Sequence, residues 1–438
     1  MKEAFVKLTK KPFVRHVAIV ATGTAAAQAV TMLLSPLITR LYGPQAYGLM
    51  GVFAAIVGII APIAALTYPM AIVLPKRNSD ARGVARLSVY ITIGIAALVA
   101  ILLLFFHQSI VRLFRLEAVA SFLFFIPLVI LFSGFLQIIE QWLIRTRQFT
   151  INAQATLGQA IIVQGSKVGI GFFYPTATVL IVLSALMNGL KSLLMVLFMR
   201  RSSRRQKIKK HADTKHVRVV AKKYHDFPIY RAPEVFLNAA AQSLPTLLLT
   251  SFFGPAASGF YTIGKNVLNL PVQLIGKSVG DVFYPRISEA ANQGENLTQL
   301  LKKTTLALTL IGLVPFGVVI VFGPWLFAFV FGDEWVRSGE YARWIALWTF
   351  FGFVKRPSIR ILTVLSAQAF LLVFTLLMLF MGVAALVTGY YVFANDIAAV
   401  ALFGTSGALL NCSLILITFS ISRTYDRKHT AIYKNNQN

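Results

Sequence analysis

Six basic residues lie inside long apolar stretches of the sequence, where charged side chains are rare: Lys167, Lys191, Lys265, Lys355, Arg356 and Arg360. An ionisable group costs roughly 2.5–3.5 kcal/mol at the centre of a membrane helix, so it usually faces a cavity or a partner. Few acids accompany them, and we expect Glu140 and Asp281 to lie near the ends of their helices. The pattern predicts a cavity with unpaired positive charge, which would suit an anionic ligand.

The segment 257–281 carries the clearest polar pattern. Lys265, Asn269, Gln273 and Lys277 recur every four residues, so neighbouring members share one face of a helix. We interpret this face as cavity lining, because a polar seam between helices, the alternative, rarely includes two lysines. Two other segments have comparable faces: Asn152, Thr156, Gln159 and Lys167 in one, and Thr24, Gln28, Thr31 and Ser35 in the other. The last face is uncharged and fits a seam and a ligand contact equally well.

The stretch "FVKRPSIRIL" has two interpretations. It could be a cytoplasmic loop, but the preceding helix would then be too short to cross a membrane and the following one too long. The favoured interpretation is one helix over 341–365, with Lys355, Arg356 and Arg360 near mid-membrane and a local opening at Pro357. Arg356 and Arg360, four residues apart, could then converge on a phosphate, which a guanidinium binds through two hydrogen bonds.

Composition determines what kind of elements hold these residues. Hydrophobic residues make up 57% of the chain and charged residues 13%, against about 25% charged residues in soluble domains. The apolar residues form blocks long enough to span a bilayer. We predict an all-α integral membrane protein with twelve spans, near 17–38, 46–72, 87–106, 118–139, 151–173, 177–199, 233–253, 257–281, 304–323, 341–365, 370–392 and 396–421.

The distribution of charge orients these spans. Most of the 42 Lys and Arg residues fall at the two termini and in one set of alternating connections. The opposite set holds Arg40, Arg112, Arg115, Arg337 and Arg343. The positive-inside rule therefore predicts that both termini are cytoplasmic. The net charge of +27 needs no nucleic-acid partner. The basic segment 200–232 is interpreted as a topology anchor that touches anionic lipid, with a docking site for a cytoplasmic partner as the alternative.

The chain contains an internal repeat. "PLITRLYGPQAYGLM" (36–50) and "LLLTSFFGPAASGFY" (247–261) share a threonine, a Gly-Pro pair and a further glycine, each displaced by 211 residues. We expect two six-helix lobes, 1–199 and 233–438, joined by the basic linker 200–232. An even number of spans per repeat makes the repeats parallel, with a substrate path between them.

Three stretches carry a resemblance to a known family: "TRLYGPQAYGLMGVF", "GFYTIGKNVLNLPVQLIGKSVGDVFYPRISE" and "FGDEW". They resemble the polysaccharide-export family of oligosaccharide flippases (O-antigen flippase-like) in the multidrug/oligosaccharidyl-lipid/polysaccharide exporter superfamily. The resemblance implies two lobes forming a V around a central cavity, and transport of undecaprenyl-pyrophosphate-linked oligosaccharide to the outer leaflet of the bacterial cytoplasmic membrane. Its implied partners are membrane lipids and other polysaccharide assembly proteins.

These expectations define a candidate binding site for the diphosphate head and its sugars. The predicted ligand-binding residues are Lys265, Asn269, Gln273, Lys355, Arg356, Arg360, Lys167, Lys191, Gln159 and Gln28. A fixed cationic site would let membrane voltage drive an anionic cargo outward without a titrating acid.

Two other functions remain as alternatives. A cation-coupled multidrug exporter of the same superfamily would rely on membrane-embedded acids, and a membrane glycan polymerase would show a large outer loop. The sequence contains no phosphate-binding glycine loop and no His-Glu metal spacing, and its single cysteine, Cys412, cannot form a thiol metal cluster. We expect a transporter without cofactor or metal, and not an enzyme.

Overall fold

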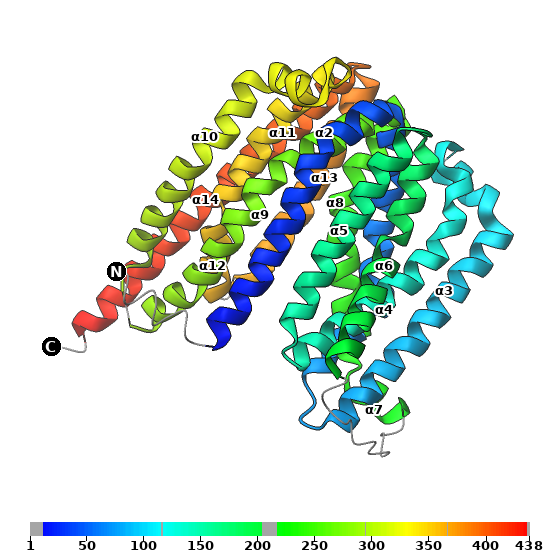
Figure 1. Cartoon of the computed structure of the whole chain (residues 1–438). Coiled ribbons are helices and arrows are strands. Elements are labelled where there is room, and N and C mark those ends of the chain that lie inside the picture. Colours follow the sequence, from blue (N-terminus) through cyan, green and yellow to red (C-terminus); the bar gives the residue numbers. More distant parts are fainter. Residues whose placement is uncertain (1–11, 115–116, 204–216, 294, 366, 436–438) are drawn as a thin grey trace. The chain divides into compact units, whose positions relative to one another are not determined.

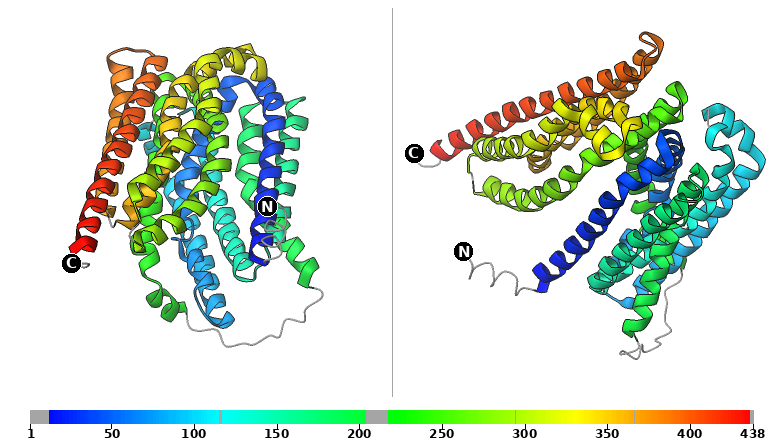
Figure 2. Two further views of the ribbon diagram at one scale, coloured as in Figure 1. Left: turned by 90° about the vertical axis from the view of Figure 1, so that its left-hand side faces the viewer. Right: turned by 45° about the horizontal axis from the view of Figure 1, so that its top comes forward.

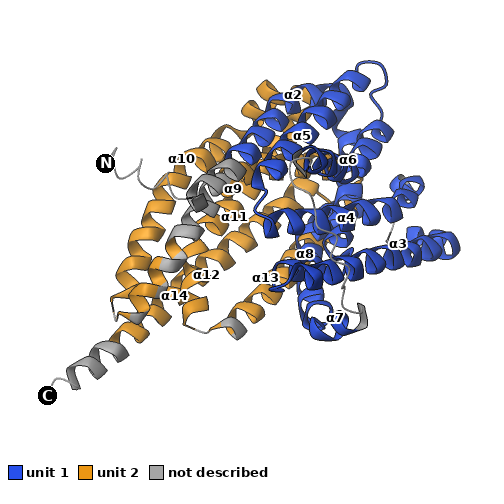
Figure 3. Ribbon diagram, turned by 60° about the horizontal axis from the view of Figure 1, so that its bottom comes forward, with its two compact units in different colours: residues 1–251 blue, residues 252–438 orange. Residues whose placement is uncertain are grey.

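A computed structural model describes residues 12–114, 117–203, 217–293, 295–365 and 367–435 (Figure 1). Every regular element among these residues is a helix, which confirms the predicted all-α class. The chain divides by its contacts into unit 1, Met1–Ser251, and unit 2, Phe252–Asn438 (Figure 3).

Unit 1 is a bundle of long helices with short helical turns between them (Figure 2). Its elements are α2 (Pro12–Ile60), η1 (Ala61–Ile63), η2 (Tyr68–Val73), α3 (Asn78–Phe114), η3 (Glu117–Phe125), α4 (Ile126–Arg145), α5 (Phe149–Gly171), α6 (Ala177–Ser203), α7 (Val217–Lys223), η4 (Phe227–Arg231) and α8 (Ala232–Phe253). The sequence places α8 in the second lobe, whereas contacts group nearly all of it with unit 1. The domain limits at 199 and 233 stay a prediction.

Unit 2 contains the remaining helices. They are α9 (Pro255–Asn292), α10 (Leu297–Phe331), η5 (Asp333–Trp335), α11 (Val336–Val354), α12 (Arg356–Val364), α13 (Gln368–Tyr391) and α14 (Asp396–Asn435).

Eight stretches of the described chain are long and apolar enough to cross a membrane, so the protein is a multi-pass membrane protein. One of them, Thr22–Ile63, overlaps two of the predicted spans, 17–38 and 46–72. Three more predicted spans correspond to helices α5, α9 and α11, which are outside this set of eight because polar and charged residues interrupt their apolar character. The count of twelve spans stays a prediction.

Two predicted helices are wrong in detail. The span 46–72 ends as an α-helix at Ile60 and continues as 3-10 turns, because Pro62 cannot donate a backbone hydrogen bond and Leu66 and Thr67 adopt positive φ. The span 341–365 is likewise two helices, α11 and α12, which meet at Lys355 just before Pro357.

The backbone confirms the internal repeat at its most recognisable motif. Gly43 has φ 67° and ψ 172°, and Gly254 has φ 87° and ψ 174°. This region of conformational space is accessible essentially to glycine alone. Pro44 and Pro255 follow directly and start the next helical segment, where a missing amide donor carries no cost. The same two residues therefore produce the same bend in each repeat.

Helix packing repeats in the same order. In unit 1, α3 packs on α4, α4 on α6, and α5 on α6. In unit 2, the helices at the corresponding places make the same pairs: α10 with α11, α11 with α14, and α13 with α14. The two halves therefore share a packing scheme as well as a sequence motif.

Arg145, at the end of α4, forms hydrogen bonds to the connection between η2 and α3. The Arg145 guanidinium donates to the carbonyl oxygens of Ile72 at 3.1 Å and Pro75 at 2.7 Å. It also donates to Asn78 Oδ1 at 3.0 and 3.1 Å. A rigid fork of donors suits several acceptors at once, so this single side chain holds three segments together.

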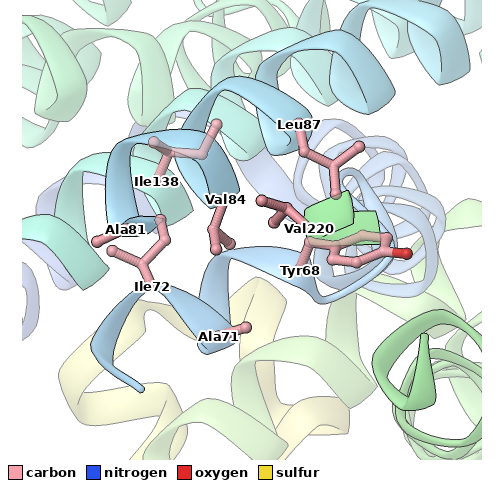
Figure 4. Packing of buried hydrophobic residues seen from close by; sticks show 8 residues of the cluster. All are labelled: Tyr68, Ala71, Ile72, Ala81, Val84, Leu87, Ile138 and Val220. Carbon is pink, nitrogen blue, oxygen red and sulfur yellow. The ribbon is translucent and has the colours of Figure 1, made fainter. Parts of the chain in front are cut away.

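The described end of the basic linker packs on unit 1. Val220 of α7 is buried in an apolar cluster with Tyr68, Ala71, Ile72, Ala81, Val84, Leu87 and Ile138 (Figure 4). Thr67 Oγ1 donates to the Phe227 carbonyl oxygen at 3.0 Å, which holds the start of η4 against the same part of unit 1. Residues 204–216, the most basic part of the linker, lie outside the described residues.

Candidate functional site

The predicted ligand-binding residues are divided between the two units. Unit 1 holds Gln28, Gln159, Lys167 and Lys191, and unit 2 holds Lys265, Asn269, Gln273, Lys355, Arg356 and Arg360. Each group is described within its own unit.

Lys191 is paired with an acid. Its ammonium on α6 donates to Glu140 Oε1 on α4 at 2.6 Å, and both side chains are largely buried. One turn away on α6, Asn188 donates to the Ser133 hydroxyl on α4 at 2.9 Å. These contacts correct the expectation that Lys191 supplies an unpaired positive charge. Its charge is neutralised inside unit 1.

Lys167 has a neutral partner instead. Its side chain is buried on α5, and its ammonium lies 3.7 Å from the Met50 sulfur on α2. The Tyr42 hydroxyl donates to the Lys167 carbonyl oxygen at 2.7 Å and fixes the backbone there. Among the described residues, no carboxylate pairs with this ammonium. Lys167 therefore has a neutral partner in the described structure, and its role in ligand binding stays a prediction.

The amide side chains of unit 1 lie on the two helices that hold Lys167. Gln28 on α2 and Gln159 on α5 are half-buried. The two helices approach so closely that a Cβ added at Gly23 would lie only 2.5 Å from Ala153 Cβ. Two hydroxyls of the predicted polar faces bond within their own helices: Thr31 to the Ala27 carbonyl and Thr156 to the Asn152 carbonyl. The amides are thus better suited than the hydroxyls to bind a ligand.

Lys355 is the best-defined cation of unit 2. It stands between α11 and α12, where its ammonium donates to Asn411 Oδ1 on α14 at 2.6 Å and lies 3.7 Å from the Met378 sulfur on α13. Asn411 is fully buried and is oriented by its own donation to the Trp348 carbonyl oxygen at 3.3 Å. Both partners are neutral, so they hold the ammonium in place without placing an opposing charge beside it.

Arg356 and Arg360 lie in the first two turns of α12. Arg356 is half-buried and Arg360 is exposed. Cations at a helix N-terminus oppose the positive end of the helix dipole, so this placement is favourable only with an anion nearby. Residues 356–364 are helical, so this segment is neither the open loop of one interpretation nor the continuous helix of the other.

The polar face of α9 becomes more exposed along the helix. Lys265 and Asn269 are half-buried and Gln273 is exposed. The Lys265 ammonium lies 5.8 Å from the centre of the Tyr261 ring, a cation–π contact. The side chains of Lys277 and Asp281 lie outside those that the structure describes.

Sequence reasoning missed the neutral partners of the buried cations. Met50, Met378 and Asn411 are far from their lysines in sequence, and a single asparagine within the apolar segment 396–421 is the only signal that could have indicated one of them. It also missed a polar cluster at the other end of α11. Arg337 Nε donates to Asp396 Oδ2 at 3.0 Å, and the Tyr341 hydroxyl donates to the same oxygen at 2.6 Å.

The described residues contain no group of His, Cys, Asp or Glu side chains that could hold a metal ion. The arrangement in each unit can therefore bind anions through ammonium and guanidinium groups and sugars through amides. Lys167 and Lys355 have only neutral partners among the described residues.

Comparisons with known proteins place this geometry in a family. Residues 37–340 match the family described as polysaccharide biosynthesis protein. No curated protein matches the chain.

Several solved structures are similar to the whole chain. An inward-facing multidrug resistance transporter of the MATE family superposes with a TM-score of 0.70 at 13% identity, covering 93% of this chain and 99% of that one. The lipid II flippase MurJ in an inward closed conformation gives a TM-score of 0.67 at 14% identity, with coverage of 95% and 93%. A MOP superfamily transporter from Pyrococcus furiosus gives a TM-score of 0.60 at 12% identity, with coverage of 95% and 96%. At such low identity these likenesses establish the fold, and the family match over most of the chain establishes that this protein belongs to the polysaccharide biosynthesis protein family, on the fold of the MOP superfamily transporters.

Proposed function

We propose that the protein is a flippase that moves an oligosaccharide linked to a lipid diphosphate from the cytoplasmic to the outer leaflet of the bacterial cytoplasmic membrane. The observation that carries the proposal is the Lys355 site, where the ammonium of a half-buried lysine is held at 2.6 Å by a neutral amide. Undecaprenyl pyrophosphate carrying an O-antigen or another surface polysaccharide repeat unit is the substrate that we infer.

A diphosphate needs fixed positive charge that the protein does not already neutralise. Among the candidate lysines, Lys191 is neutralised by Glu140, whereas Lys355 is held by Asn411 and a methionine sulfur. Arg356 directly follows Lys355 and could bind phosphate oxygens through two parallel hydrogen bonds. Amide side chains such as Asn269 and Gln273 would bind the hydroxyl groups of the sugar.

The distribution of acids favours an anionic over a cationic cargo. Between residues 341 and 425 the sequence contains one acid, Asp396. It already accepts hydrogen bonds from Arg337 and Tyr341. A multidrug exporter that binds cationic drugs through embedded acids would need carboxylates near Lys355, and this stretch supplies none. We infer transport without a chemical step, since the candidate residues offer binding groups and no nucleophile with an adjacent base.

The proposal predicts how transport is driven. A membrane potential contributes about 2.3 kcal/mol per elementary charge per 100 mV. The cytoplasm is negative, so an anionic head moves outward downhill while the cationic residues stay behind. Purified protein in vesicles with a lipid-linked oligosaccharide should therefore export faster when a voltage is imposed and respond weakly to a pH gradient alone.

The same vesicles distinguish the alternatives. Transport of a cationic dye driven by a proton or sodium gradient, without movement of the lipid-linked sugar, would contradict the flippase proposal and favour a multidrug exporter. Export that follows the pH gradient alone would contradict the fixed-charge mechanism and point to a titrating acid, with Glu140 and Asp281 as the first to test.

A further inference from the structure

A second basic site lies in unit 2, at one end of α10 and α14 and away from Lys355. A pocket of about 510 Å³ is lined by Asn296, Thr298, Gln299, Lys302, Arg423, Asp426 and Arg427. Both helices are candidate membrane spans, Leu297–Phe331 and Asp396–Arg427. The pocket therefore sits where both spans end, at the depth of lipid headgroups, on the side that the charge distribution predicts to be cytoplasmic.

The one acid that lines this pocket, Asp426, has a structural role. The two carboxylate oxygens of Asp426 accept the backbone amides of Leu297 and Thr298, at 3.1 and 2.9 Å, and cap the start of α10. The backbone N–H of Gln299 donates to Asn296 Oδ1 at 2.8 Å. The amides at this helix end are thus taken, and any ligand would have to be bound by the side chains of the pocket.

Those side chains are predominantly cationic. Lys302, Arg423 and Arg427 are exposed. Among the side chains that the structure describes, none of the three has an ion pair. Three positive charges against one capping carboxylate leave the pocket net positive, which suits a phosphate group.

The surfaces that lead away from the pocket are apolar. On α10, Leu306, Leu310 and Leu313 are exposed and follow Lys302 on nearly the same face of the helix. On α14, Leu409 and Leu416 are exposed and precede Arg423 at intervals of seven residues, so all three share one face. Lys302 and Arg423 therefore each lie at the end of an apolar stripe along a membrane span. A cationic end joined to an apolar stripe matches a phospholipid and does not match a free phosphate.

We propose that this pocket binds the headgroup of an anionic phospholipid of the cytoplasmic leaflet, with the acyl chains lying along α10 and α14. The lipid is a resident ligand and not the transported substrate, so the site is independent of the flippase proposal. Its phosphate is bound by Lys302, Arg423 and Arg427, and Asp426 keeps the end of α10 in place beside them.

The test uses the full-length protein in a neutral detergent, with phosphatidylglycerol or phosphatidylcholine of identical acyl chains added. Intact mass spectrometry of the complex gives the bound lipid, and thermal melting gives the stabilisation. We expect preferential binding of phosphatidylglycerol. We expect it to weaken roughly fivefold in Lys302→Ala and roughly 25-fold in Arg423→Ala/Arg427→Ala, because each basic side chain contributes a similar increment.

Lys303→Ala is the matched control, since Lys303 is an exposed neighbour of Lys302 on α10 that does not line the pocket. The site is overturned if Lys303→Ala weakens binding as much as Lys302→Ala, or if both lipids bind equally well. Displacement of the lipid by millimolar pyrophosphate would also overturn it, because the pocket would then select a soluble phosphate. Thermal melting in phosphatidylcholine checks that each variant is folded. If the double variant is not folded, the binding measured with Lys302→Ala alone decides whether the site exists.

Discussion

The lysines at two corresponding helix junctions have different kinds of hydrogen-bond partner. Where α4 meets α6 in unit 1, Lys191 forms an ion pair with Glu140 at 2.6 Å. Where α11 meets α14 in unit 2, Lys355 donates to the neutral Asn411, also at 2.6 Å. The helices pack in the same order in both units. The two junctions therefore share their helix packing but differ in net charge.

The difference concerns the net charge that each junction presents. An ion pair contributes no net charge to its surroundings, whereas an ammonium held by an amide has no opposing charge beside it. A buried cation with a neutral partner is costly, and a protein that retains one has a use for it. If the protein carries an anionic cargo as proposed, the comparison predicts that the junction in unit 2 binds it and the junction in unit 1 does not.

Replacing Asn411 with aspartate should have the largest effect, because it makes the second junction resemble the first. Asn411→Asp gives Lys355 a carboxylate partner of nearly equal size and neutralises its charge. Loss of a charge-assisted hydrogen bond of about 1.5–3 kcal/mol to the cargo would lower the export rate roughly 10- to 100-fold. The rate is measured with lipid-linked oligosaccharide in vesicles at equal protein content.

Asn188→Asp is the control for that experiment, since it adds the same charge to α6 in unit 1. Its effect on export should be several-fold smaller. Equal losses in the two variants would mean that Lys355 has no special role, and the distinction between the junctions would fail.

Glu140→Gln makes the reverse change and gives Lys191 a neutral partner. We expect the free energy of unfolding to fall by about 2 kcal/mol, below the range for fully buried pairs because both side chains retain some solvent contact. Denaturation in detergent, followed by tryptophan fluorescence, measures the change. The double variant Glu140→Gln/Lys191→Met removes both charges and should recover most of the stability. If it is no more stable than Glu140→Gln, the ion pair is not the cause.

The smallest effect concerns a feature that the two halves share. Gly43→Ala and Gly254→Ala each force a side chain into a backbone conformation with positive φ, and each should cost about 1 kcal/mol or more. Gly94→Ala is the control, because Gly94 lies within α3 with open space around it, so alanine should be neutral or stabilising there. Melting temperatures in detergent test all three. If the melting temperatures of Gly43→Ala and Gly254→Ala differ greatly, the two bends share a conformation but not a stability cost, contrary to this prediction.

The sequence predicted those features of the fold that depend on local pattern. Apolar blocks indicated the helices, and the recurring Gly-Pro pair indicated the repeat, because the conformations of Gly43 and Gly254 need a glycine at that point. Periodicity could not reveal that the helix after Gly43 ends at Ile60, since the turns beyond it depend on Pro62 and on the packing of Tyr68 and Ile72 against other helices.

For the site, the residue types were predictable and their partners were not. Lys167, Lys191 and Lys355 were identified because charges are rare in membrane spans. Whether each is neutralised depends on a contact between residues far apart in sequence, such as the one between Lys191 and Glu140. A helical pattern orders neighbours along one helix and carries no information on which helix comes next to it.

The Arg145 contacts have a mechanical consequence. A guanidinium that is bonded to Ile72, Pro75 and Asn78 at once makes the end of α4, the turn at η2 and the start of α3 one rigid body at that end of unit 1. Displacing any one of them alone would break several hydrogen bonds together. A motion of unit 1 that keeps these hydrogen bonds carries the three segments as a block, with its hinges elsewhere in the chain.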